Sequence, residues 1–91
     1  MNEISIHELV NLTNPHIIDI RDNFTYNSGH IKNAINIPYY SLLSNYSMYL
    51  KKSETYYCYL SNIIFLLRTK WILLEISLQG YCRLSLVEDY L

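Results

Sequence analysis

The sequence predicts an α/β fold in which a central parallel sheet is covered by helices on both faces. Short runs of strand-forming residues alternate along the chain with stretches whose apolar residues follow helical spacing. One of these runs, 16–20, is also short, apolar and β-branched, as expected of a buried parallel strand. Such alternation indicates parallel pairing, because each parallel strand needs a crossover connection before the next one.

Length and charge limit the possible functions. The 91 residues correspond to one small domain, 1–91, and the hydrophobic share of 51% is sufficient for a core. A formal net charge of −1 is too small to attract nucleic acid or an anionic membrane. The most apolar stretch, 63–76, contains charged residues and is shorter than the roughly 20 apolar residues of a membrane-spanning helix. We therefore expect no nucleic acid and no membrane as partner, and composition indicates no particular protein partner.

The cysteines and the amino terminus favour a cytoplasmic protein. Cys58 and Cys82 form no C-x-x-C motif, and no histidines stand near them at the spacing of a zinc site. The first residues show no basic region followed by an apolar stretch, so no signal peptide is expected. We expect no disulfide scaffold, no metal and no cofactor.

The first strand and helix are predicted from a short apolar segment and a helix start signal. Residues 4–6 form the strand, and the helix covers 7–12. Ser5, followed three residues later by Glu8, has the spacing of a capping box.

A turn at Asn14-Pro15 precedes the buried strand 16–20, which delivers Asp19 and Arg21 at its carboxyl end. The polar stretch 22–30 is interpreted as a loop with at most a short helix around 25–27.

A third strand at 34–37 ends before Pro38, which cannot continue a ladder. The stretch 39–49 then predicts an amphipathic helix, with apolar residues at helical spacing: Tyr39, Leu42, Leu43, Tyr46 and Leu50.

The fourth strand is predicted at 55–60, where strand formers dominate. A helix from 66 or 69 to 79 ends at Gly80, a residue suited to a left-handed cap, and the last strand covers 82–87.

A motif in the first half resembles the first signature of the rhodanese-like family of sulfurtransferases. The residues that carry the resemblance, at the spacing usual in the family, are Asp19, Arg21, Tyr26, Gly29-His30-Ile31, Ala34 and Asn36-Ile37-Pro38. Thr25 replaces the family's usual glutamate, and Asn33 stands where glycine is frequent. The resemblance is good over 4–49 and weaker over 55–91, and it implies a three-layer fold with about five parallel strands.

Physical reasoning assigns a role to the same positions. Asp19 and Arg21 follow a buried strand, at the edge where open α/β sheets place ligands, and a charge pair there can tie down the next loop. Gly29 permits a turn beside His30. We interpret Asp19, Arg21, Gly29, His30 and Pro38 mainly as scaffold residues, with direct contact between substrate and Asp19, Arg21 or His30 as the alternative.

The resemblance implies an enzyme that moves sulfane sulfur, from thiosulfate for example, through a cysteine persulfide. In the family the cysteine follows the fourth strand and an arginine lies five residues later. Backbone N–H groups around the sulfur lower its pKa, and the arginine attracts an anionic donor. Here the expected cysteine position is Leu60, and an apolar segment replaces the loop.

The remaining candidates for catalysis are Cys58, two residues early, and Arg68, which keeps the family's separation from Gly80. Cys58 is also explained as a small buried hydrophobe, and Cys82 as a structural residue. We expect an inactive or impaired copy, whose partner would be a small sulfur-containing anion if activity remains. The region after Leu60 reflects either a frameshift or a divergent loop.

Two other functions compete with that of a sulfurtransferase. A non-catalytic binding or regulatory module is the alternative, since ten tyrosines can supply contact surface. A related phosphatase would need a cysteine five residues before an arginine, a spacing that neither cysteine has.

Overall fold

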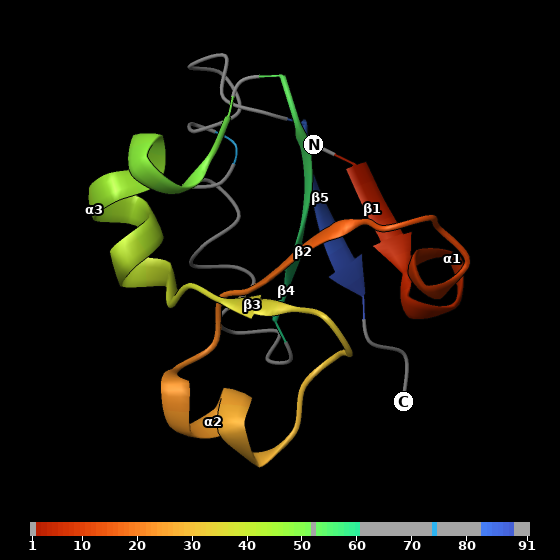
Figure 1. The fold of residues 1–91 in the computed structure, drawn as a ribbon, viewed down its shortest axis with the longest axis horizontal. Coiled ribbons are helices and arrows are strands. Elements are labelled where there is room, and N and C mark those ends of the chain that lie inside the picture. The colour runs from red at the N-terminus through yellow and green to blue at the C-terminus, as the bar shows by residue number, and fades with distance from the viewer. Residues whose placement is uncertain (1, 52, 61–73, 75–82, 89–91) are drawn as a thin grey trace.

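The computed structural model describes residues 2–51, 53–60, 74 and 83–88. In chain order their elements are β1 (Asn2–Ser5), α1 (Ile6–Val10), β2 (His16–Asp19), α2 (Asn23–Ser28), β3 (Ile35–Asn36), α3 (Tyr39–Tyr49), β4 (Thr55–Tyr59) and β5 (Arg83–Glu88) (Figure 1). These five strands form one parallel sheet in the order β1-β5-β4-β2-β3. The prediction of an α/β fold with about five parallel strands is confirmed.

Strand β4 lies at the centre of the sheet. Cys58 pairs with Ile18 of β2 on one side and with Leu86 of β5 on the other. The carboxyl ends of β2 and β4 coincide, since Asp19 is in register with Tyr59. The polar residues that follow β2 are thereby placed beside the end of β4.

The two faces of the sheet carry separate parts of the core, because successive side chains of a strand point to opposite faces. One face packs against α1, where Leu9, Ile17, Ala34 and Tyr59 form a buried cluster. The other face presents Ile18, Ile20, Tyr56, Cys58 and Leu60, all buried. Figure 1 shows α3 on the opposite side of the sheet from α1. Helix α3, in which Leu42 is buried, therefore covers the second face.

Local hydrogen bonds set the first helices. The Ser5 hydroxyl accepts a hydrogen bond from the Glu8 backbone N–H at 3.1 Å, so the predicted cap is confirmed, although α1 begins one residue earlier than expected and ends at Val10. The segment interpreted mainly as a loop contains the six-residue helix α2. Asp22 caps it by accepting hydrogen bonds from the Thr25 backbone N–H and hydroxyl, a local stabilisation that the loop interpretation did not include.

The boundaries of α3 match the prediction, but its predicted apolar face is wrong in part. Leu42 and Leu50 are buried, whereas Tyr39 and Leu43 are exposed. Tyr39 and Leu43 lie in the first part of the helix, where Leu42 is the buried residue; further along, Asn45, with a φ of −139° and a ψ of 37°, breaks the helix into two segments. A change of phase at this kink removes the continuous stripe that regular helical spacing assumes.

The predicted helix from 66 or 69 to 79 and its cap at Gly80 lie outside the described residues, apart from Leu74, which is helical and exposed. Among the described helices none is long and apolar enough to cross a membrane.

Candidate functional site

The candidate site lies at the carboxyl edge of the sheet, where Asp19 ends β2. The Asp19 side chain is fully buried, and Arg21 donates hydrogen bonds to it from Nη2 at 2.7 Å and from Nε at 2.9 Å. The Arg21 backbone N–H also donates to the Asp19 carboxylate, at 3.0 Å. A buried carboxylate is stable only with such partners, so the pair is a built part of this edge.

Arg21 joins three segments of the chain. Its Nη2 donates to the Gly29 carbonyl at 2.7 Å, which holds the end of α2 against β2. Its guanidinium carbon lies 4.9 Å from the centre of the Tyr59 ring, a cation–π distance. The hydrogen bonds to Asp19 raise the pKa of Arg21 above its ordinary value, against the opposing effect of burial. The guanidinium therefore stays charged, and much of its hydrogen-bonding capacity is committed to the protein.

Asn36 links the ends of β2 and β3. Its side-chain amide donates to the Asp19 carbonyl at 3.0 Å and to the Arg21 carbonyl at 2.9 Å. The Ile37 backbone N–H donates to the Asp19 carbonyl as well. These bonds fix the chain on both sides of Ile20 and so orient Arg21.

The loop after α2 places His30 at the rim of this edge. Its Nδ1 lies 2.9 Å from the Tyr26 carbonyl, and its ring stacks on the Tyr26 ring with 3.8 Å between centroids. The Tyr26 hydroxyl donates to the Ala34 carbonyl at 2.5 Å. Gly29 ends α2 with a φ of 159°, in a region where a side chain is disfavoured.

Two further positions of the motif are explained by the backbone. Asn33 has a φ of 69°, in the left-handed region that asparagine tolerates better than most residues, and it stands where glycine is frequent in the family. Pro38 is the cap residue of α3, and its carbonyl accepts hydrogen bonds from the N–H groups of Ser41 and Leu42.

The position at which the family resemblance predicts a cysteine is Leu60, which has no thiol. Leu60 follows β4 directly and is 6% exposed. Cys58, the alternative thiol, is 0% exposed and lies within β4, which continues to Tyr59. Alternation along the strand places Cys58 on the face opposite to Tyr59 and Arg21. Arg68 and Cys82 lie outside the described residues.

Tyr59 and Asn36 take part in this site although sequence reasoning did not assign them a role. Asn36 had a signal, since it belongs to the Asn36-Ile37-Pro38 motif. Tyr59 had none in the local sequence, because its contact with Arg21 depends on the pairing of β2 with β4.

The described residues supply no set of metal ligands. No three of their His, Cys, Asp and Glu side chains lie together in an arrangement that would hold a metal ion. The side chains at this edge are Arg21, which is paired with Asp19, the aromatic ring of Tyr59, and Leu60.

Comparison with known proteins identifies the architecture. A family model described as "Rhodanese-like domain" matches residues 5–88. No curated protein matches the chain significantly.

Several solved structures are similar to this chain. A rhodanese-related protein from Thermoplasma volcanium has a TM-score of 0.75 and 25% identity, with 98% of this chain and 85% of that chain covered. The Rhodanese_3 like domain of an Anabaena sp protein has a TM-score of 0.67 and 30% identity, with 85% of each chain covered. A rhodanese-like domain protein from Staphylococcus aureus, at 23% identity and a TM-score of 0.74 over 98% of this chain and 86% of that one, shares the fold.

Proposed function

The chain belongs to the rhodanese-like domain family, and from this premise we propose that it keeps the family's fold without the family's sulfur carrier. In active relatives a cysteine thiolate attacks the outer sulfur of a donor such as thiosulfate, forms a persulfide and releases sulfite. Cyanide then takes the sulfur as thiocyanate and regenerates the thiolate. Each step requires a thiol at the end of β4.

The observation that carries the proposal is Leu60. It directly follows the last residue of β4, at the point where the family places its cysteine, and it is buried. A hydrocarbon side chain neither ionises nor forms a covalent bond with sulfur. The scaffold around this point is nevertheless present, since Asp19, Arg21 and Gly29 are hydrogen-bonded together.

Cys58 does not replace the missing thiol in this proposal. A nucleophilic cysteine is normally accessible and lies in an electropositive environment, whereas Cys58 is fully buried among apolar neighbours of a central strand. Its ladder partners Ile18 and Leu86 flank it on both sides. Its position is that of a small core residue.

A thiosulfate and cyanide assay tests the proposal. We expect the wild-type protein to form no more thiocyanate than Cys58→Ser or Cys82→Ser, each compared with an active rhodanese as positive control. Wild-type turnover that disappears in Cys58→Ser but persists in Cys82→Ser would identify Cys58 as a carrier and overturn the proposal. Mass spectrometry after incubation with thiosulfate is a second readout, with no increase of one sulfur atom expected.

A second proposal is a non-catalytic binding module, which the surface of α3 favours. Five large hydrophobic residues of this helix are exposed, and among them are Tyr40 at 56%, Leu43 at 44% and Met48 at 78%. Apolar and aromatic groups of this kind are enriched in the centres of protein interfaces. A partner recovered by the wild type but not by Met48→Glu, with Ser47→Glu as matched control, would support this function. Equal recovery by both variants would contradict a role of this surface.

We further propose a cytoplasmic location. In support, Cys58 is not part of a disulfide and the formal net charge is −1, properties that fit a reducing compartment with no membrane attraction. Fractionation of cells with an antibody against the chain tests this, and recovery with membranes or outside the cell would contradict it.

A further inference from the structure

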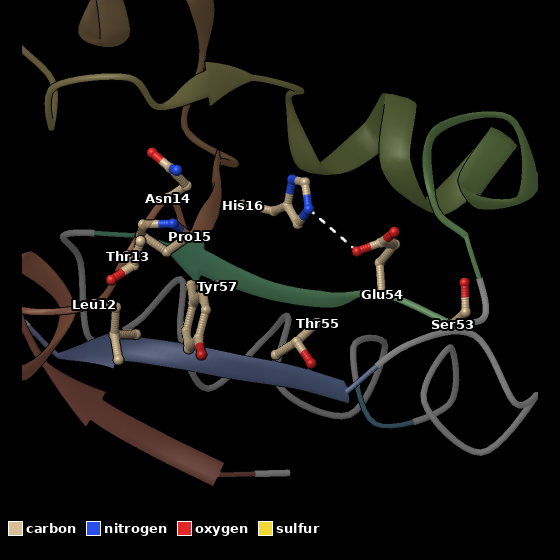
Figure 2. A pocket seen from close by; sticks show the side chains of 9 residues that line it. All are labelled: Leu12, Thr13, Asn14, Pro15, His16, Ser53, Glu54, Thr55 and Tyr57. Atoms are coloured by element: carbon tan, nitrogen blue, oxygen red, sulfur yellow. Dashed lines mark ion pairs between the residues drawn. The ribbon is translucent and has the colours of Figure 1, made fainter.

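A hollow of about 300 Å³ lies at the amino-terminal edge of the sheet, where β2 and β4 begin (Figure 2). It is formed by the loop 12–15, by His16, by residues 53–54 and by Thr55 and Tyr57 of β4. Along β2 this edge is roughly 10 Å from the end occupied by Asp19, at about 3.3 Å per strand residue. The hollow is therefore separate from the candidate site described above. Its volume is at the lower end of the range, about 300 to 1,000 Å³, of small-molecule sites.

The lining is rich in neutral hydrogen-bonding groups that the described part of the protein does not use. Hydroxyls come from Thr13, Ser53, Thr55 and Tyr57, and an amide comes from Asn14. None of these side chains makes a hydrogen bond in the described part of the chain. Thr55 and Tyr57 are only partly exposed, and as alternate residues of β4 they extend from the same face of the sheet (Figure 2).

The imidazole and the carboxylate of the lining lie within bonding distance of each other. His16 Nε2 lies 3.2 Å from Glu54 Oε2, and Figure 2 shows the two side chains directed toward each other. None of the described residues that line the hollow is a lysine or an arginine. An anion would thus meet a carboxylate without a compensating cation, and a cation would have to compete with His16 for Glu54. A neutral ligand meets neither obstacle.

We propose that this hollow binds a small uncharged polyhydroxy compound, a polyol or a monosaccharide. Hydroxyl groups donate and accept hydrogen bonds, which matches the hydroxyls and the amide of the lining. Leu12, Pro15 and the Tyr57 ring supply apolar surface for the C–H groups of such a compound. The proposal does not depend on the function proposed for the opposite edge of the sheet.

Titrations of the 91-residue protein, followed through its backbone amide NMR signals, test the proposal. The probes are sorbitol and glucose, with thiosulfate and methylammonium as anionic and cationic comparisons. We expect sorbitol or glucose to give saturable shifts confined to residues 12–16 and 53–57, and the two ions to give none there. Absence of saturable shifts with both neutral probes would overturn the proposal.

Two variants identify the groups responsible. Tyr57→Phe removes one hydroxyl and keeps the ring, and we expect it to weaken binding by about three- to tenfold, the effect of losing one hydrogen bond. Ser53→Ala removes another hydroxyl of the lining and should also weaken binding. Because Ser53 is exposed in a loop, this variant is expected to fold normally. The matched control is Tyr40→Phe on α3, which does not line the hollow and should leave Kd unchanged.

Two results would contradict the proposed ligand class. Unchanged affinity in both Tyr57→Phe and Ser53→Ala would show that the neutral probes bind elsewhere. Binding of methylammonium in place of the neutral probes, with loss in Glu54→Gln, would show a cation site.

Discussion

Arg21 and Asp19 are joined by two nitrogens of the guanidinium and both oxygens of the carboxylate, with Nη2 2.7 Å from Oδ2 and Nε 2.9 Å from Oδ1. The Asp19 side chain is 0% exposed and that of Arg21 is 13% exposed. The carboxylate thus has little access to water and depends on Arg21 and on the backbone for its stabilisation.

Replacement of Arg21 by methionine, which keeps an apolar stem, should lower the free energy of unfolding by about 3 to 5 kcal/mol, because a buried carboxylate loses its cation. Urea unfolding followed by circular dichroism at neutral pH measures this difference. Lys32→Met is the control, since Lys32 is exposed, and it should change stability by less than about 0.5 kcal/mol. Equal stability of the two variants would contradict a structural role of the pair.

Low pH should reduce the free energy of unfolding, partly through protonation of Asp22. Hydrogen bonds from the Thr25 hydroxyl, and then from its backbone N–H, hold the pKa of Asp22 below its ordinary value of 3.8. A depressed pKa means that the folded state favours the carboxylate, so this stabilisation is present above the ordinary pKa and is lost as the pH falls through the folded value.

The variant Asp22→Asn keeps a cap for α2 but does not titrate. Its stability should therefore fall less steeply than that of the wild type between about pH 5 and about pH 2. Urea unfolding at several pH values compares the two slopes. Parallel slopes would show that Asp22 contributes nothing to the acid sensitivity.

Asn33 should accept glycine but not alanine. At its φ of 69° a Cβ is unfavourable, and alanine lacks the polar side chain that helps asparagine adopt this conformation. We expect Asn33→Ala to lose about 1 kcal/mol of stability and Asn33→Gly to lose less. Thermal or urea unfolding of both variants gives the comparison, and a more stable alanine variant would contradict the assigned conformation.

The Cys58 thiol should be inaccessible in the native protein. With Cys82 replaced by serine, labelling of Cys58 by a disulfide reagent should wait for an opening of the central sheet and be at least about a thousandfold slower than in denaturant. A cysteine at the exposed Ser47, in a background without Cys58 and Cys82, provides the fast control. Comparable labelling rates for both thiols in the native protein would contradict the burial of Cys58. Cys58 would then again be a candidate sulfur carrier.

Features controlled by neighbouring residues were the ones that sequence reasoning predicted well. The cap at Ser5 depends on a bond to the N–H three residues later, and the strand at 16–20 is a short β-branched run, observed as His16–Asp19. The family motif also located Asp19 and Arg21, because both are held by contacts within the same short segment.

Features that depend on distant segments were missed. The contact of Arg21 with Tyr59 requires β2 and β4 to be neighbours, and the hollow combines the loop before β2 with the loop before β4. The kink at Asn45 was not predicted for another reason. A prediction from helical spacing assumes that the helix is unbroken. Local sequence patterns do not predict the order of the strands in the sheet or the position at which a helix is interrupted.

The place of β5 between β1 and β4 has a consequence for how the protein is made. During synthesis β1 is made well before β5, which is its pairing partner in the described sheet. Until β5 is made, one edge of β4 and both edges of β1 have no neighbour in the described sheet and are open to any other extended chain. A nascent copy is thus prone to aggregate until β5 has been made, so a chaperone that shields these edges should raise the yield of folded protein.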